Sequence, residues 1–469
     1  MQAGKLSDGA VMPAVEGATL RRDLGTWAAV AIVVGTTIGS GIFLVPKEMI
    51  QKVGSPGMVF AVWVVGGILA LFGSLAAGEL SAAMPEAGGG TAYLREAYGP
   101  FWGFVYGWTM MWVAQSGSIA TLGTGFFYYL ANFFPGLDRV VGVVSLPIGP
   151  HGGPLEVRYG QFASIAIILL LAGINYSGVR FGGGVQVGVT IVKVSLIAGI
   201  VLLGVFGGVG NAANYRTSVT AVGGFTGFFA ALVAALWAYD GWFNLTFVGS
   251  EIKNPQRNLP LALTLGTMAV IAIYVLANAA YFYVLPASGV AQSDRVAAEM
   301  MRKIAGSPGA AAVSVAAMIS IFAALNGSIL SGSRIPFALA RDGYFFRSFA
   351  KVHPRYRTPG VSILGLSAWG SVLVLSGRYE QLYTMVIFAI WILYAMNIAA
   401  VIVLRRKRPE LPRPYRVPGY PWVPVVFVVT AIALLISTLL ESPRESLLGL
   451  GLIMVGLPFY FHWKRRRLL

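Results

Sequence analysis

GTTIGSGIF, from Gly35 to Phe43, interrupts a hydrophobic segment that is long enough to span a bilayer. A second stretch, LWAYDGWFN from Leu236 to Asn244, interrupts another such segment later in the chain. Inside hydrocarbon every unpaired backbone group is costly, so a break of this kind is tolerated only where it lines a cavity or is buried in protein. Paired breaks at corresponding positions of two halves indicate a binding site between them. The two stretches therefore predict a cavity within the membrane, bounded by two broken helices.

The composition around these stretches is that of a polytopic membrane protein. Of the 469 residues, 57% are hydrophobic and only 11% are charged, and the mean hydropathy is +0.73. A soluble domain has about 25% charged residues. The first 22 residues are polar, and the apolar run after them has spanning length and no small-residue cleavage site, so we expect no signal peptide.

Residue types that carry metal or redox chemistry are scarce. The chain has no cysteine, which excludes disulfides, thiol catalysis and iron–sulfur clusters. Its three histidines, His151, His353 and His462, are scattered near predicted loops or ends, so we expect no zinc site. The predicted helices show no paired carboxylates of the kind that enzymes use. We therefore expect neither an enzyme nor a cofactor.

Apolar windows of about 20 residues predict an all-α fold with twelve membrane-spanning helices. The predicted helices cover residues 26–50, 57–84, 101–131, 160–177, 184–207, 223–249, 260–285, 309–339, 360–376, 381–404, 422–440 and 446–463. Turn signals such as Asn254-Pro255 and Thr358-Pro359 separate them. An even number of spans places both termini on the same side of the membrane.

The basic residues indicate which side that is. With both termini in the cytoplasm, the cytoplasmic segments hold 23 of the 34 Lys and Arg residues, the opposite segments hold 10, and Lys193 lies within a helix. This bias predicts a cell-membrane protein with cytoplasmic termini. The net charge of +16 then mostly reflects the membrane topology, and it gives no reason to expect that the protein binds nucleic acid. We expect the RRKR and KRRR clusters to contact anionic membrane lipids.

The two halves form a coarse inverted repeat. The first and sixth predicted helices are both interrupted, and they enter the membrane from opposite sides because an odd number of helices separates their starts. This predicts five helices plus five inverted helices, with two additions. The predicted segments are 1–22 (cytoplasmic N-terminal segment), 23–208 (first repeat), 222–404 (second repeat), 421–463 (two additional helices) and 464–469 (basic cytoplasmic C-terminus).

The first break offers binding groups for both the carboxylate and the amine of an amino acid. The free N–H groups of the following half-helix, with the positive end of its dipole, favour a carboxylate. Gly39, Ser40 and Gly41 would supply such N–H groups. The preceding half-helix ends in free carbonyls, which suit an ammonium group. Close packing between helices is the alternative reason for these glycines; we favour the site because a second break accompanies the first.

Asp240 lies at the second break. As one of few ionisable residues within predicted helices, it is a candidate contact for the substrate amine or a helper to coupling. It could equally cap the half-helix that follows, because aspartate accepts hydrogen bonds from free helix N–H groups. The sequence leaves both interpretations open.

Lys193 lies in the middle of a predicted helix, in TIVKVSLIAG. Its charge needs carbonyls or a carboxylate around it, so it could be a fixed or proton-responsive cation in a sodium-like position. The alternative is a lysine that extends to the membrane interface. Its distance from the nearest predicted helix end favours the first interpretation.

Other polar residues of the predicted helices have structural explanations. Glu79 and Arg334 lie near helix ends and favour pairing or loop anchoring, while Glu251 favours a gate or cap on the cytoplasmic side. Uncharged candidates for lining the cavity are Gln115, Ser116, Ser118, Asn326 and Ser328. Interhelical hydrogen bonding explains most residues of this kind.

A series of motifs follows in order along residues 20–440: GTTIGSGIF, AYDGW with EIKNP, NGS before Arg334, KVHPRYRTP and RRKRPELPRPYRVPGYPWVP. Together they resemble the amino acid–polyamine–organocation (APC) superfamily, and most of all its L-type amino acid transporter (LAT) family, in a prokaryotic-type member. The resemblance implies a LeuT-type fold, with a 5+5 inverted repeat, and transport by alternating access.

The resemblance also implies roles for residues at both breaks. The substrate carboxylate would contact the N–H groups of Ser40 and Gly41, and the amine would contact the carbonyl of Thr37. At the second break the resemblance implies carbonyl contacts at Trp237 and Asp240. The Trp237 side chain would be the gate that covers the substrate.

Two further implications concern coupling and partners. Lys193 matches a lysine that takes the place of a sodium ion in the family, which implies sodium independence. Many relatives have glycine where Asp240 stands, so Asp240 could contribute a charge besides its carbonyl. Eukaryotic members join a heavy subunit through a cysteine; this chain has none, so we expect a monomer without that partner.

We therefore expect a sodium-independent secondary transporter of neutral L-amino acids. It would work by exchange, facilitated diffusion or proton coupling. The alternative is a permease for cationic amino acids or amines, which Asp240 suggests. A membrane sensor without transport is a third possibility, disfavoured because no sizeable soluble domain is predicted.

Overall fold

The first interrupted stretch divides one span into two helices. In the computed structural model, α1 (Thr26–Thr37) ends and α2 (Gly41–Val53) begins across three non-helical residues, and the two helices are bent by 43°. The second stretch separates α9 (Gly224–Tyr239) from the short helix α10 (Asn244–Phe247). Both predicted breaks are thus present in the backbone.

The structure describes residues 22, 24–86, 88–144, 155–177, 180–221, 223–376 and 379–468, and for 144, 180–186 and 467–468 only the backbone. The predicted N-terminal segment 1–22 lies almost wholly outside the described residues. The side chain of Arg180, which was counted in the charge bias, also lies outside them.

The described residues include eight helices that are long and apolar enough to cross a membrane, or nine if α1 and α2 form one bent span. These helices are α3 (Pro56–Ala83), α7 (Tyr159–Tyr176), α8 (Arg180–Phe206), α11 (Pro255–Val284), α13 (Val296–Gly332) with α14 (Arg334–Arg341), α16 (Tyr379–Lys407), α17 (Trp422–Glu441) and α18 (Pro443–Leu468). The chain is therefore a helical multi-pass membrane protein.

Further helices fill the predicted positions between these spans. The sequence predicted one helix over 101–131; the structure has α5 (Pro100–Thr109), a π-helical turn η1 (Met110–Ala114) and α6 (Gln115–Leu130) in direct succession. The helix predicted at 360–376 is α15 (Gly360–Ser376). A π-helical turn within a helix is often found next to a functional site, and the helix after it contributes to the cavity described below.

The remaining elements are short and lie in connections. They are α4 (Gly90–Tyr98), α12 (Ala287–Gln292), η2 (Pro135–Asp138), η4 (Ala212–Arg216), η5 (Gly249–Glu251) and η6 (Arg347–Ala350), with an antiparallel hairpin of β1 (Val140–Val144) and β2 (Leu155–Arg158). The hairpin was not predicted; it falls in a Gly- and Pro-rich connection of the predicted helices.

Local signals explain where several helices start and stop. Gly54 ends α2 with φ at +80°, a value that glycine adopts without steric cost. The Ser55 side chain then caps α3 by accepting a hydrogen bond from the N–H of Met58, and Pro56 is the first residue of the helix. Pro255 likewise begins α11.

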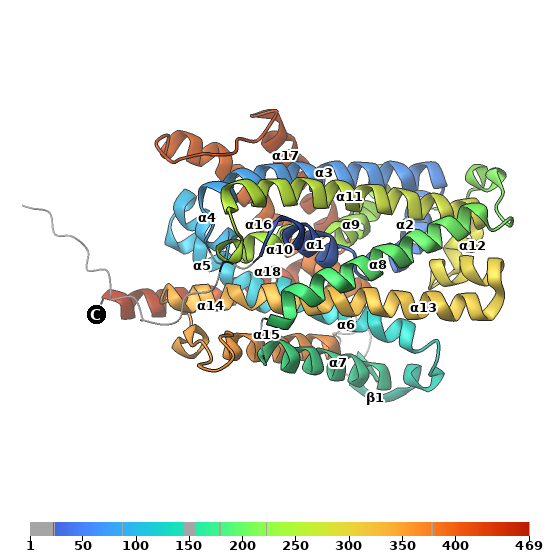
Figure 1. The fold of residues 1–469 in the computed structure, drawn as a ribbon, viewed down its shortest axis with the longest axis horizontal. Coiled ribbons are helices and arrows are strands. Elements are labelled where there is room, and N and C mark those ends of the chain that lie inside the picture. Colours follow the sequence, from blue (N-terminus) through green and yellow to red (C-terminus); the bar gives the residue numbers. More distant parts are fainter. Residues whose placement is uncertain are drawn as a thin grey trace, which may run out of the picture.

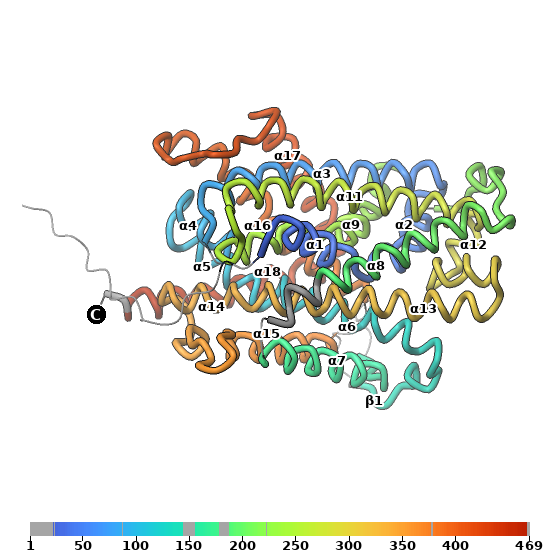
Figure 2. Tube along the Cα trace, in the orientation of Figure 1, coloured from blue at the N-terminus to red at the C-terminus, as the bar shows by residue number. Residues whose placement is uncertain are grey.

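The two broken helices lie in the interior of the bundle. Figure 1 shows α1 between α11 and α13, and α9 packs against α2. Figure 2 shows that α8, although distant in sequence, crosses next to α1. The breaks are therefore enclosed by the surrounding helices.

The bundle has two distinct ends. One end carries α4, α14 and the C-terminus, and the other carries α12 and β1 (Figure 1). We call the first the basic end, because Arg334–Arg357, Arg405–Arg416 and the C-terminal arginines lie in the segments there. The clustering agrees with the charge bias of the sequence.

Candidate functional site

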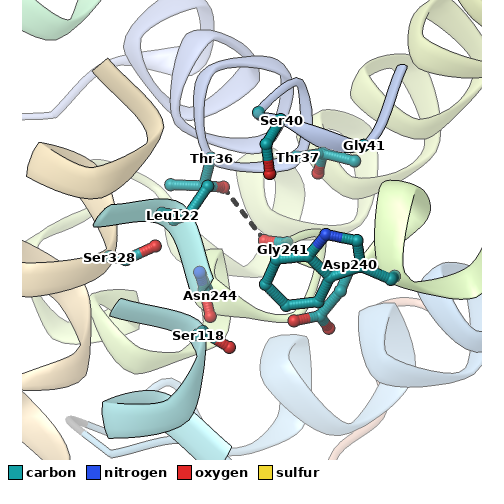
Figure 3. A pocket seen from close by; sticks show the side chains of 12 residues that line it. Thr36, Thr37, Ser40, Gly41, Ser118, Leu122, Asp240, Gly241, Asn244 and Ser328 are labelled. Atoms are coloured by element: carbon teal, nitrogen blue, oxygen red, sulfur yellow. Dashed lines mark hydrogen bonds between the residues drawn. The ribbon is translucent and has the colours of Figure 1, made fainter. Parts of the chain in front are cut away.

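A polar pocket lies where the two breaks meet. It is lined by Thr36, Thr37, Gly39, Ser40, Gly41, Ser118, Leu122, Trp237, Asp240, Gly241, Asn244 and Ser328. These residues come from both broken helices and from α6 and α13. Figure 3 shows Ser40 and Gly41 on one side of the pocket and Ser118, Asn244 and Ser328 on another.

The structure brings five of the predicted site residues together. Thr37, Ser40, Gly41, Trp237 and Asp240 all line this one pocket. The sixth, Lys193, is not among the lining residues, although it touches the first break, as described below.

The first break presents free backbone donors to the pocket. Ser40 is the N-cap of α2, and its side chain makes no capping hydrogen bond. Phe43 and Leu44 donate their N–H groups to the carbonyl of Ser40, which leaves the N–H groups of Gly41 and Ile42 at the start of α2 available to an anion. The buried hydroxyl of Thr37 has no hydrogen-bond partner among the described residues, so it too is available to a ligand.

A glycine allows the two broken helices to touch. A Cβ on Gly41 would lie 2.5 Å from both the Cα and the Cβ of Ala238 on α9. Such a distance is not possible without movement of the backbone. Gly41 therefore contributes the close approach of α2 to α9 as well as its N–H group.

Gly241 makes the matching contact at the second break. Its φ is +118°, and its carbonyl accepts a hydrogen bond of 3.0 Å from the Thr36 hydroxyl, drawn as a dashed line in Figure 3. A Cβ at Gly241 would lie 2.8 Å from the Thr36 carbonyl carbon. The conformation and the contact both require glycine here.

Tyr274 of α11 joins the two breaks, a contact that the sequence analysis missed. Its hydroxyl lies 3.0 Å from the carbonyl oxygen of Thr37 and 2.8 Å from that of Ala238. The carbonyl of Trp237 already accepts the N–H of Asp240 at 3.1 Å. Each carbonyl oxygen has two lone pairs and can accept two hydrogen bonds. At Thr37 and Trp237 one lone pair is already used by these donors, so a substrate amine would bind to the other.

Asp240 is oriented by a tyrosine. The hydroxyl of Tyr394 on α16 donates to Asp240 Oδ1 at 2.8 Å. The N-cap of α10 is Phe243, with no side-chain capping bond, while the Asp240 carboxylate also accepts a hydrogen bond from the backbone N–H of Gly241, directly after it at the break. In the described part of the chain, Asp240 forms no ion pair. An unpaired carboxylate thus faces the pocket.

Trp237 is held by two tyrosines of α16 that the sequence analysis also missed. Its indole N–H donates to the hydroxyl of Tyr379 at 2.8 Å, and that hydroxyl lies 2.8 Å from Ser40 Oγ. The ring of Tyr383 stacks on Trp237 with a centroid distance of 6.0 Å and an angle of 20°. The signal for these residues is a Tyr–Tyr spacing of four in an apolar helix, which suggests one shared face.

Lys193 lies inside the bundle and does not extend to the interface. Its side chain is fully buried, and Nζ donates to the carbonyls of Gly35 at 2.8 Å and Ile38 at 2.5 Å. The hydroxyl of Ser320 donates to the same Ile38 carbonyl at 3.3 Å. The interfacial interpretation is therefore wrong, and the lysine neutralises the carbonyls exposed by the first break.

The uncharged candidates divide into two groups. Ser118 and Ser328 line the pocket, whereas Gln115 donates to the carbonyl of Ser328 at 2.9 Å and Asn326 accepts from Asn175 at 2.7 Å. Ser116 donates to the carbonyl of Met111. Interhelical and local hydrogen bonds account for these last three. Thr36 and Asn244 line the pocket and were not singled out from the sequence.

Two ion pairs with buried carboxylates lie toward the basic end. Arg334 Nε lies 3.3 Å from Glu251 Oε1, with side-chain exposures of 1% and 7%. Arg405 holds both carboxylate oxygens of Glu79, at 2.8 and 2.6 Å. The pairing predicted for Glu79 and Arg334 is therefore present, and Glu251 joins the segment after the second break to α14.

A third cluster joins α4 to the end of α14. Arg95 lies 2.6 Å from Asp342 and 3.0 Å from Glu86. Partial burial would lower the pKa of the Arg95 guanidinium, but these two carboxylates raise it above its usual value. Within the described ranges, no group of three or more acidic or histidine side chains offers a metal site.

Comparison with known proteins gives full-length matches. Residues 24–454 match the amino acid permease family. The serine/threonine exchanger SteT of Bacillus subtilis (strain 168) is 34% identical over 457 residues, covering 96% of this chain and 98% of the relative. The human b(0,+)-type amino acid transporter 1 is 31% identical, covering 95% and 89%. The human Asc-type amino acid transporter 1 is 30% identical, covering 97% and 84%. The matched region contains both breaks and every residue of the pocket.

Proposed function

Because the chain belongs to the amino acid permease family and is an amino acid transporter, we propose that it exchanges small neutral L-amino acids, serine and threonine among them, across the cell membrane by alternating access. The observation that carries this proposal is the pocket between the two breaks. Its free N–H groups suit a carboxylate and its carbonyls suit an amine, so it complements the part that all amino acids share.

The α-carboxylate would bind the N–H groups of Ser40 and Gly41. The α-amine would bind the carbonyls of Thr37, Trp237 and Asp240. The unpaired Thr37 hydroxyl supports this arrangement, because a buried polar group without a partner costs free energy that a bound ligand restores.

The side-chain end of the pocket favours a small polar substrate. Ser118, Asn244 and Ser328 present polar groups there, and few apolar side chains line the pocket. A hydroxyl-bearing side chain would find hydrogen-bond partners in these residues, whereas a large aliphatic one would leave them unpaired. The B. subtilis relative, a serine/threonine exchanger, agrees with this choice.

Lys193 supports sodium independence. Its ammonium lies against the carbonyls of Gly35 and Ile38, where a mobile cation would otherwise neutralise the break. Transport would then be driven by the gradients of the exchanged amino acids and not by sodium.

The proposed architecture is the LeuT-type arrangement of twelve spans. The nine candidate spans, together with α9–α10, α15 and the continuous α5–η1–α6, account for that number. Residues 23–208 and 222–404 would be the inverted repeats, with 421–463 added. The basic end would face the cytoplasm with both termini, and the monomer would work without a disulfide-linked subunit, since the sequence has no cysteine.

A second candidate is transport of cationic amino acids. It rests on Asp240, whose carboxylate lines the pocket with Tyr394 as its hydrogen-bond donor and without an ion pair in the described residues. A side-chain ammonium or guanidinium would compensate this charge. Asp240→Asn should then weaken inhibition by lysine more than inhibition by serine.

Uptake into liposomes tests both candidates. We expect labelled serine to enter purified-protein liposomes rapidly only when they contain unlabelled serine or threonine, and equally well when sodium is replaced by choline. Excess alanine or threonine should compete, and lysine, arginine and putrescine should not. Stronger competition by lysine than by serine would favour the second candidate. Absence of serine and threonine uptake under every one of these conditions would falsify the proposed exchange.

A further inference from the structure

A chain of two hydrogen bonds joins three elements above the pocket. Trp237 Nε1 on α9 and Tyr379 Oη on α16 are 2.8 Å apart, and Tyr379 Oη and Ser40 Oγ at the first break are 2.8 Å apart. An indole N–H can only donate, so Tyr379 accepts from Trp237 and uses its single hydrogen to donate to Ser40. The three side chains are buried, with exposures of 6%, 6% and 0%.

The ring of Trp237 is held by packing as well. Tyr379 meets it edge to face at 6.4 Å, and Tyr383, one helical turn further along α16, stacks on its face. The hydroxyl of Tyr383 donates elsewhere, to a carboxylate oxygen of Glu48 on α2. The two tyrosines therefore share the packing of Trp237, but only Tyr379 connects it to Ser40.

Ser40 takes part in two separate interactions. Its backbone N–H belongs to the proposed carboxylate site, and its side-chain oxygen is the acceptor for Tyr379. An anion that orders the backbone at Ser40 would also fix the position of Oγ. A bound carboxylate would thereby favour the hydrogen bond from Tyr379 to Ser40. Tyr379, held in this way, would in turn hold the indole of Trp237.

We propose that Tyr379 is a latch that couples binding of the substrate carboxylate at Ser40 to closure of the Trp237 lid. This inference rests on the proposed function and adds a positioning residue to it. Tyr379 begins α16, and α16 ends at the basic end. The latch therefore controls access from the opposite end of the bundle.

The natural absence of cysteine makes closure measurable. Leu122→Cys places a single thiol on a residue of α6 that lines the pocket. Its rate of modification by a membrane-impermeant thiol reagent, added from the side of α12, reports opening of the lid. In protein with a normal Tyr379 we expect serine to slow the modification, and ethanolamine, which has the amine and hydroxyl but no carboxylate, to leave it unchanged.

Tyr379→Phe in this background should weaken protection by serine about fivefold to tenfold, as expected for the loss of one or two net hydrogen bonds. Ser40→Ala should have a similar effect, and the double variant should be no worse than either single one, because both remove the same connection. Tyr383→Phe is the matched control: it deletes a hydroxyl from the same helix face and should keep serine protection within about twofold.

Two results would overturn the latch. One is full serine protection in Tyr379→Phe; the other is an equal loss in Tyr383→Phe, which would show that the effect is not specific to the hydroxyl that contacts Ser40. These outcomes differ from failure of the proposed function, in which no amino acid protects Leu122→Cys when Tyr379 is intact.

Discussion

At the scale of single residues, Lys193 has the contacts that bear most directly on coupling. Its ammonium has two carbonyl partners at the first break, and within the described residues it forms no ion pair with a carboxylate. The carbonyl oxygens at the break therefore stabilise the buried ammonium, and the ammonium supplies the hydrogen bonds that these carbonyls lack. Neither arrangement is stable alone in a low-dielectric interior.

Removal of this charge should impair transport more than folding. In Lys193→Ala the carbonyls of Gly35 and Ile38 lose their ammonium donor, while Ser320 still serves Ile38. Charged hydrogen bonds contribute about 1.5–3 kcal/mol each, so we expect serine exchange to fall roughly tenfold or more. Initial exchange rates in liposomes at several pH values provide the measurement.

Thr190→Val is a matched control for that variant. Thr190 lies about one turn earlier on α8, and its hydroxyl donates to the carbonyl of Ala31, away from the break. Its loss should leave exchange nearly unchanged. If Lys193→Ala exchanges serine as fast as the parent across the pH range, the lysine has no role in coupling.

The sequence identified the residues at the breaks but not those that hold them. Gly39, Ser40 and Asp240 stand out because polar and small residues within a spanning apolar segment need an explanation. Tyr274, Tyr379 and Tyr394 do not stand out, since tyrosine is common in membrane helices. Which face of α11 or α16 meets the breaks depends on packing between distant segments, and one sequence does not contain that information.

At the scale of elements, the close contact between α2 and α9 is the main constraint on the site. It brings the free N–H groups of one break beside the carbonyls of the other. The contact depends on the missing side chain of Gly41, whose Cβ would meet the backbone of Ala238 and not a movable side chain. Relief would require the two helices to separate.

We therefore expect Gly41→Ala to abolish or strongly reduce transport. Overpacking of this kind costs roughly 1–3 kcal/mol, so the thermal midpoint should fall while the protein still folds. Gly173→Ala on α7 is the matched control, because a Cβ there meets nothing within 4 Å. Serine exchange and thermal unfolding in detergent would be compared for both. Normal exchange by Gly41→Ala would contradict the need for this approach.

Sequence patterns anticipated the helices better than their irregularities. Long apolar runs located α3, α7 and α11 within a few residues. The π-helical turn at Met110–Ala114 has no composition signal, because it requires only one shift in hydrogen bonding within an otherwise helical segment. The hairpin of β1 and β2 depends on pairing between strands separated by a connection, which local propensity does not specify.

At the scale of the whole molecule, the ion pairs at the basic end hold segments that must separate if the pocket is to open there. Arg334 and Glu251 connect α14 to the segment after the second break, and both are almost fully buried. Breaking such a pair by removing one partner leaves a buried charge without compensation, at a cost of about 3–5 kcal/mol.

Arg334→Gln should therefore lower both the thermal midpoint and serine exchange. Glu251→Gln should be milder, because Arg334 keeps its bond to the carbonyl of Leu330. The double variant should recover part of the stability lost in Arg334→Gln, since no unpaired carboxylate remains. Glu86→Gln, in an exposed pair with Arg95, should change the thermal midpoint very little. Additive losses in the double variant would refute the pairing.

The global arrangement was predictable in outline because the membrane limits the choices. Chain length, apolar segments and the distribution of arginine and lysine leave few topologies for a helical membrane protein. The positions of α1 and α9 inside the bundle follow from their breaks, since an interrupted helix cannot face lipid. The membrane places no comparable constraint on the hairpin and the short helices at the two ends, so their contacts could not be predicted from the sequence.

The covalent attachment of Lys193 has a thermodynamic consequence for the pools on either side of the membrane. A cation that belongs to the chain returns with it after each cycle, so it dissipates no ion gradient and supplies no work. With exchange as the proposed mode, one amino acid can be concentrated only while another runs down its own gradient. At steady state the inside-to-outside ratios of all exchanged amino acids would become equal, and the total pool would stay constant.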